Sequence, residues 1–263
     1  MYSLNISPIA FTIGTLDIYW YGVLYAVSLL ISWCFASIIV KKINENTICP
    51  ITLNDLDHFL FIGIIITILS ARLGHILFYD LNYYLNYPLE IFMLRNGGLS
   101  FHGSLIGLTT YIYFYCKKKN ISKIFISDLL SISAPLGLIT GRLANFVNQE
   151  LYGKIWINNK GVIFPLVDSF PRYPTQIFEA ITEGLLTFFI NIFVLRLLKW
   201  KSVGSGIYTT FFFIIYSSSR FIIEFYKDVE NIYVLNNFIF TIGQLLCMVM
   251  FIFGIFIFNL NKK

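Results

Sequence analysis

Long apolar stretches, seven in number and each about 20 residues long, run through almost the whole chain of 263 residues. One helix needs about 20 mostly apolar residues to cross the hydrocarbon core of a bilayer. Residues 59–69 and 248–258 are apolar on every helical face, whereas a strand of a membrane barrel alternates between two faces. The sequence therefore predicts an all-α integral membrane protein with seven transmembrane helices. Their predicted bounds are 18–40, 58–79, 98–116, 124–146, 176–198, 206–227 and 236–260.

Charged residues make up 13% of the sequence and hydrophobic residues 57%. A soluble domain carries about 25% charged residues, so this composition does not suit a surface that faces water. The longest segment outside the apolar stretches, residues 146–175, is too short for a separate domain, and we expect one membrane-embedded domain over residues 1–263. The 4 cysteines are scattered, without the spacing of metal ligands. We therefore expect no metal and no cofactor.

Basic residues indicate the orientation of the helices, because cytoplasmic loops are enriched in Lys and Arg. If the N-terminus lies outside, the inner loops hold eleven basic residues, and the outer loops and span ends hold five. We therefore expect an extracytoplasmic N-terminus, a cytoplasmic C-terminus and no nucleic-acid partner. The inner residues are Lys41, Lys42, Lys117, Lys118, Lys119, Lys123, Arg196, Lys199, Lys201, Lys262 and Lys263, and the outer ones are Arg95, Lys154, Lys160, Arg172 and Lys227.

Three arginines fall inside the predicted helices, where an ionisable side chain is costly and suggests a function. Arg72, Arg142 and Arg220 lie a few residues from the outer ends of their helices, and His102 and Tyr21 lie near the outer ends of two others. At a rise of about 1.5 Å per residue, all of them are within roughly 10 Å of the outer boundary. Guanidinium can bind phosphate through two parallel hydrogen bonds. We therefore expect an outer-leaflet pocket for a phospholipid headgroup.

Polar neighbours of two of these arginines extend the predicted pocket. Arg142, Asn145 and Gln149 have the spacing i, i+3 and i+7, which predicts that they share one helical face. Arg220 and Glu224 are four residues apart and can form an ion pair. This pair is either part of the site or a self-neutralising pair that lets the helix enter the membrane.

Other polar residues allow two interpretations each. Glu179 and Glu183 share a face of their helix, where they act as acid and base or bind the arginines of other helices. His102 follows a glycine-rich entry to its helix, where it is a catalytic base or a hydrogen-bonded structural residue. Tyr216 lies one turn before the arginine of its own helix, on the same face.

Six motifs, in order and over nearly the whole chain, closely resemble those of the prolipoprotein diacylglyceryl transferase family. Seven spans and an external N-terminus agree with that family. Tyr173 stands where the family usually has His, and Ser104 and Ala144 each stand where it has Gly. The motifs are Trp20-Tyr21-Gly22, Ala71-Arg72-Leu73-Gly74, the run from Gly97 to Gly103, the run from Gly141 to Gly153, Pro174-Thr175-Gln176-Ile177-Phe178-Glu179 and Arg220-Phe221-Ile222-Ile223-Glu224-Phe225.

The resemblance implies a multi-pass enzyme of the bacterial inner membrane, with its active site near the periplasmic side. Its expected reaction moves the diacylglyceryl group of phosphatidylglycerol to the thiol of the lipobox cysteine of a preprolipoprotein and releases glycerol phosphate. The expected partners are phosphatidylglycerol, the signal peptide with its lipobox, and membrane lipids. The expected catalytic residues are His102, Arg142, Arg220, Glu224 and Tyr21, and the expected substrate-binding residues are Arg142, Asn145, Glu150, Gly153, Arg220, Arg72, Gly98 and Tyr216.

Residue chemistry gives reasons for these roles. We expect Arg142 and Arg220 to hold the phosphate and to stabilise the charge that develops as the carbon–oxygen bond breaks. Because a thiolate is the nucleophile, a base is needed, for which His102 is the candidate and Glu224 the alternative. The arginines supply the positive charge that a metal would bring. We expect Asn145 and Glu150 to orient the glycerol, Tyr21 to contact the headgroup or the peptide, and Arg72 to contact the phosphate or support the site.

Two other classes of protein compete with this interpretation. A lipid or anion transporter also uses an arginine-lined pocket, but it needs a polar path through both leaflets. The inner halves of the helices are nearly free of charge, with Asp128 as the main exception. A membrane phosphatase or acyltransferase needs a nucleophilic His with a partner acid or a His-x-x-x-x-Asp pattern, and His102 has neither in sequence.

Overall fold

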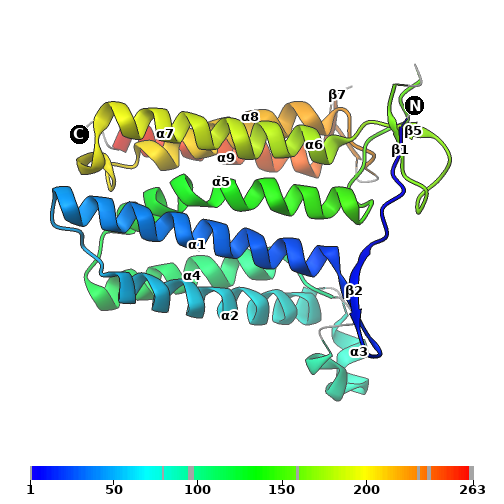
Figure 1. Ribbon diagram of the computed structural model, residues 1–263, viewed down its shortest axis with the longest axis horizontal. Coiled ribbons are helices and arrows are strands. Elements are labelled where there is room, and N and C mark those ends of the chain that lie inside the picture. Colours follow the sequence, from blue (N-terminus) through cyan, green and yellow to red (C-terminus); the bar gives the residue numbers. More distant parts are fainter. Residues whose placement is uncertain are drawn as a thin grey trace.

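The computed structural model describes residues 2–78, 80–93, 98–157, 160–229, 232–235 and 238–260, without the side chains of residues 78, 101, 102, 232–235, 238, 239 and 260. Most of this part of the chain forms long helices that run side by side in one bundle (Figure 1). These helices are α1 (Trp20–Asn46), α2 (Leu53–Phe78), α4 (Phe101–Lys119), α5 (Lys123–Val147), the continuous helix made of α6 (Thr175–Glu179), η3 (Ala180–Leu186) and α7 (Thr187–Leu198), then α8 (Ile207–Glu224) and α9 (Ile242–Leu260).

Each predicted apolar stretch overlaps one of these helices, and several of the helices extend beyond the predicted bounds. Within the described part of the chain, five helices are long and apolar enough to cross a membrane, namely α1, α2, α5, the continuous helix over 175–198 and α9. Two are more polar, because α4 ends in three lysines and α8 carries three consecutive serines besides Arg220 and Glu224. Large apolar side chains such as Leu69 and Phe193 are more than half exposed along the bundle. The chain is a multi-pass membrane protein.

The last predicted helix, over 236–260, begins too early. The helix α9 begins at Ile242, and an antiparallel hairpin of β6 (Ile232–Leu235) and β7 (Phe238–Thr241) precedes it. Both strands consist mainly of β-branched and aromatic residues, which favour extended structure over helix. An apolar run alone did not distinguish these two structures.

A layer of short elements, which we call the outer layer because it lies beyond the helix ends, covers one end of the bundle, and the end of α9 lies at the other (Figure 1). The fold is mostly helical, but this layer adds strands that the sequence analysis did not predict. Strands β2 and β3 form an antiparallel hairpin, and β4 pairs parallel with β1 and antiparallel with β5. The elements of this layer, other than the hairpin β6–β7, are β1 (Tyr2–Ser3), β2 (Ile9–Ile13), β3 (Leu16–Tyr19), α3 (Leu81–Asn86), η1 (Pro88–Phe92), β4 (Val162–Ile163) and β5 (Pro171–Arg172).

Helices α2 and α4 cross closely because glycines meet at the crossing point. A Cβ atom on Gly74 would lie 2.6 Å from the Cα atom of Gly103, and a Cβ atom on Gly107 would lie 2.1 Å from the hydroxyl of Ser70. Small residues are typical of such contacts in membranes, where backbones gain contact by close approach. The crossing fixes the start of α4, which carries His102.

At the end of the bundle away from the outer layer, Asp128 joins α5 to the start of α8. This residue of α5 is fully buried. One of its carboxylate oxygens accepts hydrogen bonds from the backbone N–H groups of Gly204 and Gly206, at 2.9 and 2.8 Å. The other accepts from the backbone N–H and the hydroxyl of Thr209, at 3.0 and 2.7 Å. Two of these donors, the N–H groups of Gly206 and Thr209, lie at the start of α8, where the first N–H groups have no helical partner. A structural role therefore accounts for this charge, which the sequence analysis had noted as an exception.

Candidate functional site

Two carboxylates from the continuous helix over 175–198 form the centre of the candidate site. Glu179 ends α6 and Glu183 lies in the π-helical segment η3, and both side chains are fully buried. Gln176 and Thr187, also fully buried, continue the same polar face. A π-helical segment inside an α-helix is frequent at functional sites. Here the segment holds one of two carboxylates that face other helices.

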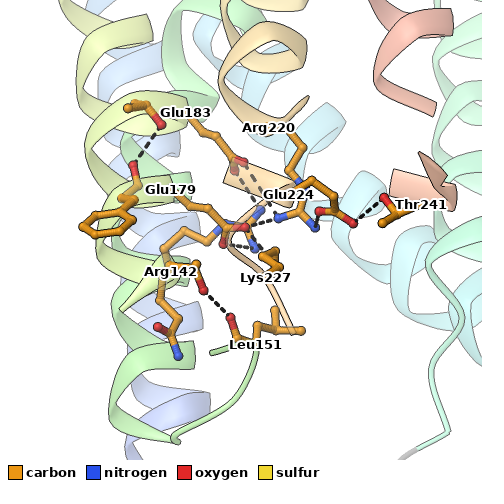
Figure 2. A network of polar contacts seen from close by, with 12 residues as sticks. Arg142, Leu151, Glu179, Glu183, Arg220, Glu224, Lys227 and Thr241 are labelled. Carbon is orange, nitrogen blue, oxygen red and sulfur yellow. Dashed lines mark hydrogen bonds and ion pairs between the residues drawn. The ribbon is translucent and has the colours of Figure 1, made fainter. Parts of the chain in front are cut away.

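Two arginines from neighbouring helices meet at these carboxylates (Figure 2). On α5, the Nη2 atom of Arg142 lies 2.7 Å from Oε2 of Glu183, and its Nη1 atom lies 3.2 Å from Oε2 of Glu179. On α8, Nη1 of Arg220 donates to Oε1 of Glu179 and lies 3.9 Å from Oε1 of Glu183. Nη2 of Arg220 also lies 3.1 Å from Glu224, so the predicted pair along α8 is confirmed. The sequence allowed two interpretations of Glu179 and Glu183. The structure shows the one in which both carboxylates bind arginines of other helices.

A third cation belongs to the cluster, and the sequence analysis counted it only as an outer-loop charge. The Nζ atom of Lys227 lies 2.9 Å from Oε1 of Glu179, and Lys227 is 2% exposed. Glu224 in turn accepts a hydrogen bond from the hydroxyl of Thr241 at 3.0 Å. Lys227 lies three residues after the end of α8 at Glu224, so helical spacing does not determine where its side chain points. Its bridge with Gly153 does, and the sequence pattern gave no signal for that bridge.

Opposite charges balance in this cluster, which we call the charge cluster: Arg142, Arg220, Lys227, Glu179, Glu183 and Glu224. The side chains of Glu179 and Glu183 are 0% exposed, whereas those of Arg142 and Arg220 keep 15% and 19% exposure. An approaching ligand therefore meets guanidinium groups first. The Nε atom of Arg142 is buried and has no hydrogen-bond acceptor among the described residues. The accessible side of the cluster suits an anion.

Tyr21, Asn145 and Glu150 lie beside one another at the outer side of Arg142. Tyr21 interacts with Asn145, and it is close enough to Glu150 for an electrostatic interaction. Asn145 is 4% exposed, whereas Glu150 is exposed and accepts a hydrogen bond from Asn148 at 2.5 Å. The helix α5 carries Asn145 on the turn after Arg142, so the predicted pairing of these two on one face agrees with the helix.

The prediction that Gln149 shares this face is wrong. The helix α5 ends at Val147, and Gln149 has a φ of 58° in the left-handed region. Its amide instead donates to the carbonyl of Leu4 at 3.4 Å and accepts from the N–H of Leu166 at 2.8 Å. The side chain therefore fastens the outer layer to the end of α5. Helical spacing does not apply past a helix end.

Gly153 occupies the place where three outer segments meet. Its N–H donates to the carbonyl of Tyr173 at 2.9 Å, and it forms an antiparallel bridge with Lys227. A Cβ atom here would lie 2.6 Å from Cβ of Tyr173 and 2.6 Å from the carbonyl oxygen of Tyr226. Only glycine fits this crossing without movement of its neighbours. The close approach positions Lys227, so packing accounts for a glycine that the family resemblance assigned to substrate binding.

Arg172 holds the same outer segments together from the other side. Its Nη1 atom donates to the carbonyl of Gly153 at 3.1 Å and to Asp228 at 2.8 Å, and its Nη2 atom donates to Asp168 at 2.6 Å. Its guanidinium also stacks on the ring of Tyr152 at 4.7 Å. The bond with Arg172 lowers the pKa of Asp168, and the pKa of Arg172 is raised in turn. This outer ion pair supports the segment that carries Lys227.

Arg72 has a different environment from the other two arginines. Its guanidinium donates to backbone carbonyls between α3 and α4, those of Ile91 at 3.0 Å, Glu90 at 2.5 Å and Gly98 at 3.2 Å. It also stacks on the ring of Tyr84 at 4.9 Å. Of the three arginines that the sequence analysis placed at one depth, Arg142 and Arg220 therefore meet at the charge cluster, and Arg72 binds a different part of the structure. Arg72 shapes the outer segment before α4.

Gly98 belongs to the environment of Arg72 as well. Its φ is 77°, in the left-handed region, and a Cβ atom would lie 2.6 Å from Nη1 of Arg72.

His102 lies in the first turn of α4, but its side chain lies outside the described part of the structure. Tyr216 on α8 lies within electrostatic reach of Glu183 and Arg142. Of the predicted residues, Tyr216 therefore lies beside the charge cluster, and Gly98 beside Arg72.

An apolar groove of about 460 Å³ lies between α8 and α9, next to the charge cluster. Phe221 and Ser217 line it from α8, and Cys247 and Phe251 line it from α9. Cys247 is within electrostatic reach of Arg220 and Glu224. The chain thus places an apolar surface beside a group of cations.

Comparison with known protein families agrees with the motifs. Residues 8–260 match the family model described as prolipoprotein diacylglyceryl transferase. The chain belongs to this family. Relatives named phosphatidylglycerol–prolipoprotein diacylglyceryl transferase occur in Ehrlichia ruminantium, at 40% identity over 98% of both chains, and in Rickettsia typhi, at 38% identity over 98% of both chains. A third, in Rickettsia bellii, is 38% identical over 96% of this chain and 94% of its own.

Proposed function

We propose that this protein transfers the diacylglyceryl group of phosphatidylglycerol to the thiol of a lipobox cysteine in a prolipoprotein, the first step of lipoprotein maturation. The observation that carries the proposal is the meeting of Arg142 and Arg220, from different helices, at one pair of buried carboxylates with their guanidiniums still partly exposed. The family and the names of the relatives supply the substrates. This arrangement gives two planar cations for one phosphate.

In this reaction a carbon–sulfur bond forms and the carbon–oxygen bond to the phosphate breaks. The electron pair of the breaking bond goes to the phosphate oxygen, and Arg142 and Arg220 stabilise the charge that develops there. The thiol proton passes to a base, for which His102 and Glu224 are the candidates. Glu224 has the weaker case, because Arg220 and Thr241 already bind its carboxylate. Asn145, Glu150 and Tyr21 orient the glycerol headgroup.

The same proposal sets the protein in the membrane. All seven long helices cross the bilayer of the bacterial inner membrane, with the N-terminus in the periplasm, the C-terminus in the cytoplasm and one domain over the whole chain. Supporting this, the ends of α1 and α4 carry Lys41, Lys42 and Lys117 to Lys119, away from the charge cluster. The acyl chains then lie along apolar surfaces such as the groove between α8 and α9.

The test is a reaction of the purified protein in detergent with dioleoyl phosphatidylglycerol and a lipobox peptide that contains one cysteine. The expected result is a peptide that gains the mass of one diacylglyceryl group, together with release of glycerol phosphate. A peptide with serine in place of cysteine is the matched control and gains nothing. An unmodified cysteine peptide, with flux of lipid or anion across vesicles instead, contradicts the proposal and favours a transporter.

A further inference from the structure

The charge cluster presents a difficulty for a phosphate ligand. Each arginine is already bound to carboxylates, Arg142 to Glu179 and Glu183, and Arg220 to those two and Glu224. A phosphate that binds both guanidiniums competes with these carboxylates and weakens their contacts with the arginines. Glu179 would then lose the pairing that allows its carboxylate to stay charged while fully buried. A buried charge without a partner is strongly unfavourable.

Lys227 resolves this difficulty, because it pairs with Glu179 in addition to the arginines. Its Nζ atom lies 2.9 Å from Oε1 of Glu179, the oxygen that Arg220 also contacts, whereas Arg142 contacts Oε2 at 3.2 Å. At 2% exposure, the lysine is hardly screened by solvent. Among the described residues, Glu179 is the carboxylate that forms an ion pair with Lys227. An ammonium is a compact point charge that one carboxylate oxygen can hold.

The backbone holds Lys227 in place independently of the arginines. Lys227 forms its bridge with Gly153. Lys154, the residue after Gly153, donates its backbone N–H to the carbonyl of Tyr226, the residue before Lys227, at 2.8 Å. The next residue, Asp228, binds Arg172 at 2.8 Å. The partner Glu179 is fixed as well, because Gln176, one turn before it, donates to a backbone carbonyl at 2.5 Å. A lipid that displaces the arginines therefore leaves this ion pair in place.

We propose that Lys227 is a positioning residue. It keeps the buried carboxylate of Glu179 in place and paired with a cation when the phosphate of the lipid binds Arg142 and Arg220. The inference rests on the proposed function and assigns a role to a residue outside the predicted site. Without the lysine, two arginines face three carboxylates, so the cluster carries one excess negative charge that repels the phosphate. With the lysine, the cluster is neutral before the lipid binds.

The test measures KM and kcat for dioleoyl phosphatidylglycerol, with the lipobox peptide in excess. Lys227→Met raises KM about 10-fold or more and lowers kcat by less, because the loss falls on lipid binding. Lys227→Arg keeps KM within about 3-fold, because the charge is retained. Lys160→Met, at an exposed outer lysine, is the matched control and leaves KM unchanged. An unchanged KM in Lys227→Met overturns the inference.

A double-mutant cycle separates this role from a merely structural one. Glu179→Gln in the Lys227→Met background removes the excess negative charge. KM should therefore fall most of the way back to the wild-type value. Loss of packing at Lys227 is not repaired by that second change, so an unrecovered KM contradicts the proposal. If Lys227→Met alone fails to fold, the same comparison runs in the Glu179→Gln background, where Lys227→Met changes KM by less than about 3-fold. A larger rise there overturns the inference.

Failure of the inference differs from failure of the proposed function. If the wild-type protein transfers no diacylglyceryl group to the peptide, the proposed function is wrong. If the wild type transfers it and the cycle shows no coupling between Lys227 and Glu179, the function stands and the role of Lys227 does not.

Discussion

The guanidinium of Arg142 and the carboxylate of Glu183 lie 2.7 Å apart, although 41 residues separate them in the chain. The first projects from α5 and the second from the π-helical segment of the neighbouring helix. With Arg220 on α8, the pair joins three helices at one buried point. A buried ion pair of this kind costs desolvation energy, so stability alone is a weak reason for it. Binding of an anion by the accessible guanidiniums is the stronger reason.

Arg142→Ala should abolish most of the transfer while the protein still inserts into the membrane. Removal of one preorganised donor at a developing charge costs about 100-fold or more in rate. Arg196→Ala is the matched control, since Arg196 is exposed in the last turn of α7. Transfer rates and membrane-fraction yields of both variants are the measurements. Near-normal transfer by Arg142→Ala removes the phosphate-binding role.

His102→Gln should lower the transfer rate and change its dependence on pH. If His102 is the base, its neutral imidazole accepts the thiol proton, so the wild-type rate falls in acid as the imidazole becomes protonated. Glutamine does not titrate, and the variant loses this limb of the profile. The measurement is the rate between pH 5 and pH 8, at fixed lipid and peptide. An unaltered rate and profile assigns His102 to structure.

Gly153→Ala should disturb both stability and lipid binding. The added Cβ atom would lie 2.6 Å from Tyr173 and Tyr226, so the bridge that positions Lys227 must shift. Gly63→Ala is the control, because its Cβ atom would meet Tyr111 at an ordinary 3.5 Å inside α2. There the change should be neutral or stabilising by about 0.5–1 kcal/mol. Equal thermal midpoints in detergent for the two variants would contradict this account of Gly153.

Asp168→Asn should lower stability at neutral pH, and the effect should fade in acid. Arg172 lowers the pKa of Asp168 in the folded protein, so the unfolded chain binds protons more readily. The contribution is therefore complete above the ordinary pKa of about 3.9 and is lost as pH falls through the lower folded value. Thermal midpoints between pH 3 and pH 7 are the measurement, and Glu45→Gln in an exposed pair is the control. A difference that is the same at every pH would refute the linkage.

Apolar stretches were sufficient to predict where the long helices lie, because a span must satisfy its own backbone in lipid. They did not predict the hairpin before α9, since apolar strands and apolar helices look alike over short runs. The partners of Arg220 were partly predictable, because Glu224 lies one turn away on the same helix. Contacts such as Arg142 with Glu183 depend on which helices become neighbours, and helical spacing does not contain that information.

The outer layer was the least predictable part of the site. Gln149 looked like a member of the face of Arg142, yet α5 ends two residues earlier. Arg72 matched the depth of the other arginines, but depth does not specify which side of the bundle a residue faces. Lys227 was counted as a loop charge, although a bridge to Gly153 turns it inward. In each case a local backbone turn or a long-range pairing decided the position.

The position of a bound phosphatidylglycerol tests the central claim most directly. A structure of the protein with this lipid should place the phosphate oxygens within hydrogen-bond distance, roughly 3 Å, of guanidinium nitrogens of both Arg142 and Arg220. In the same structure, Glu179 should still contact Lys227. A phosphate bound elsewhere, with both arginines still paired to Glu179 and Glu183, would contradict the account.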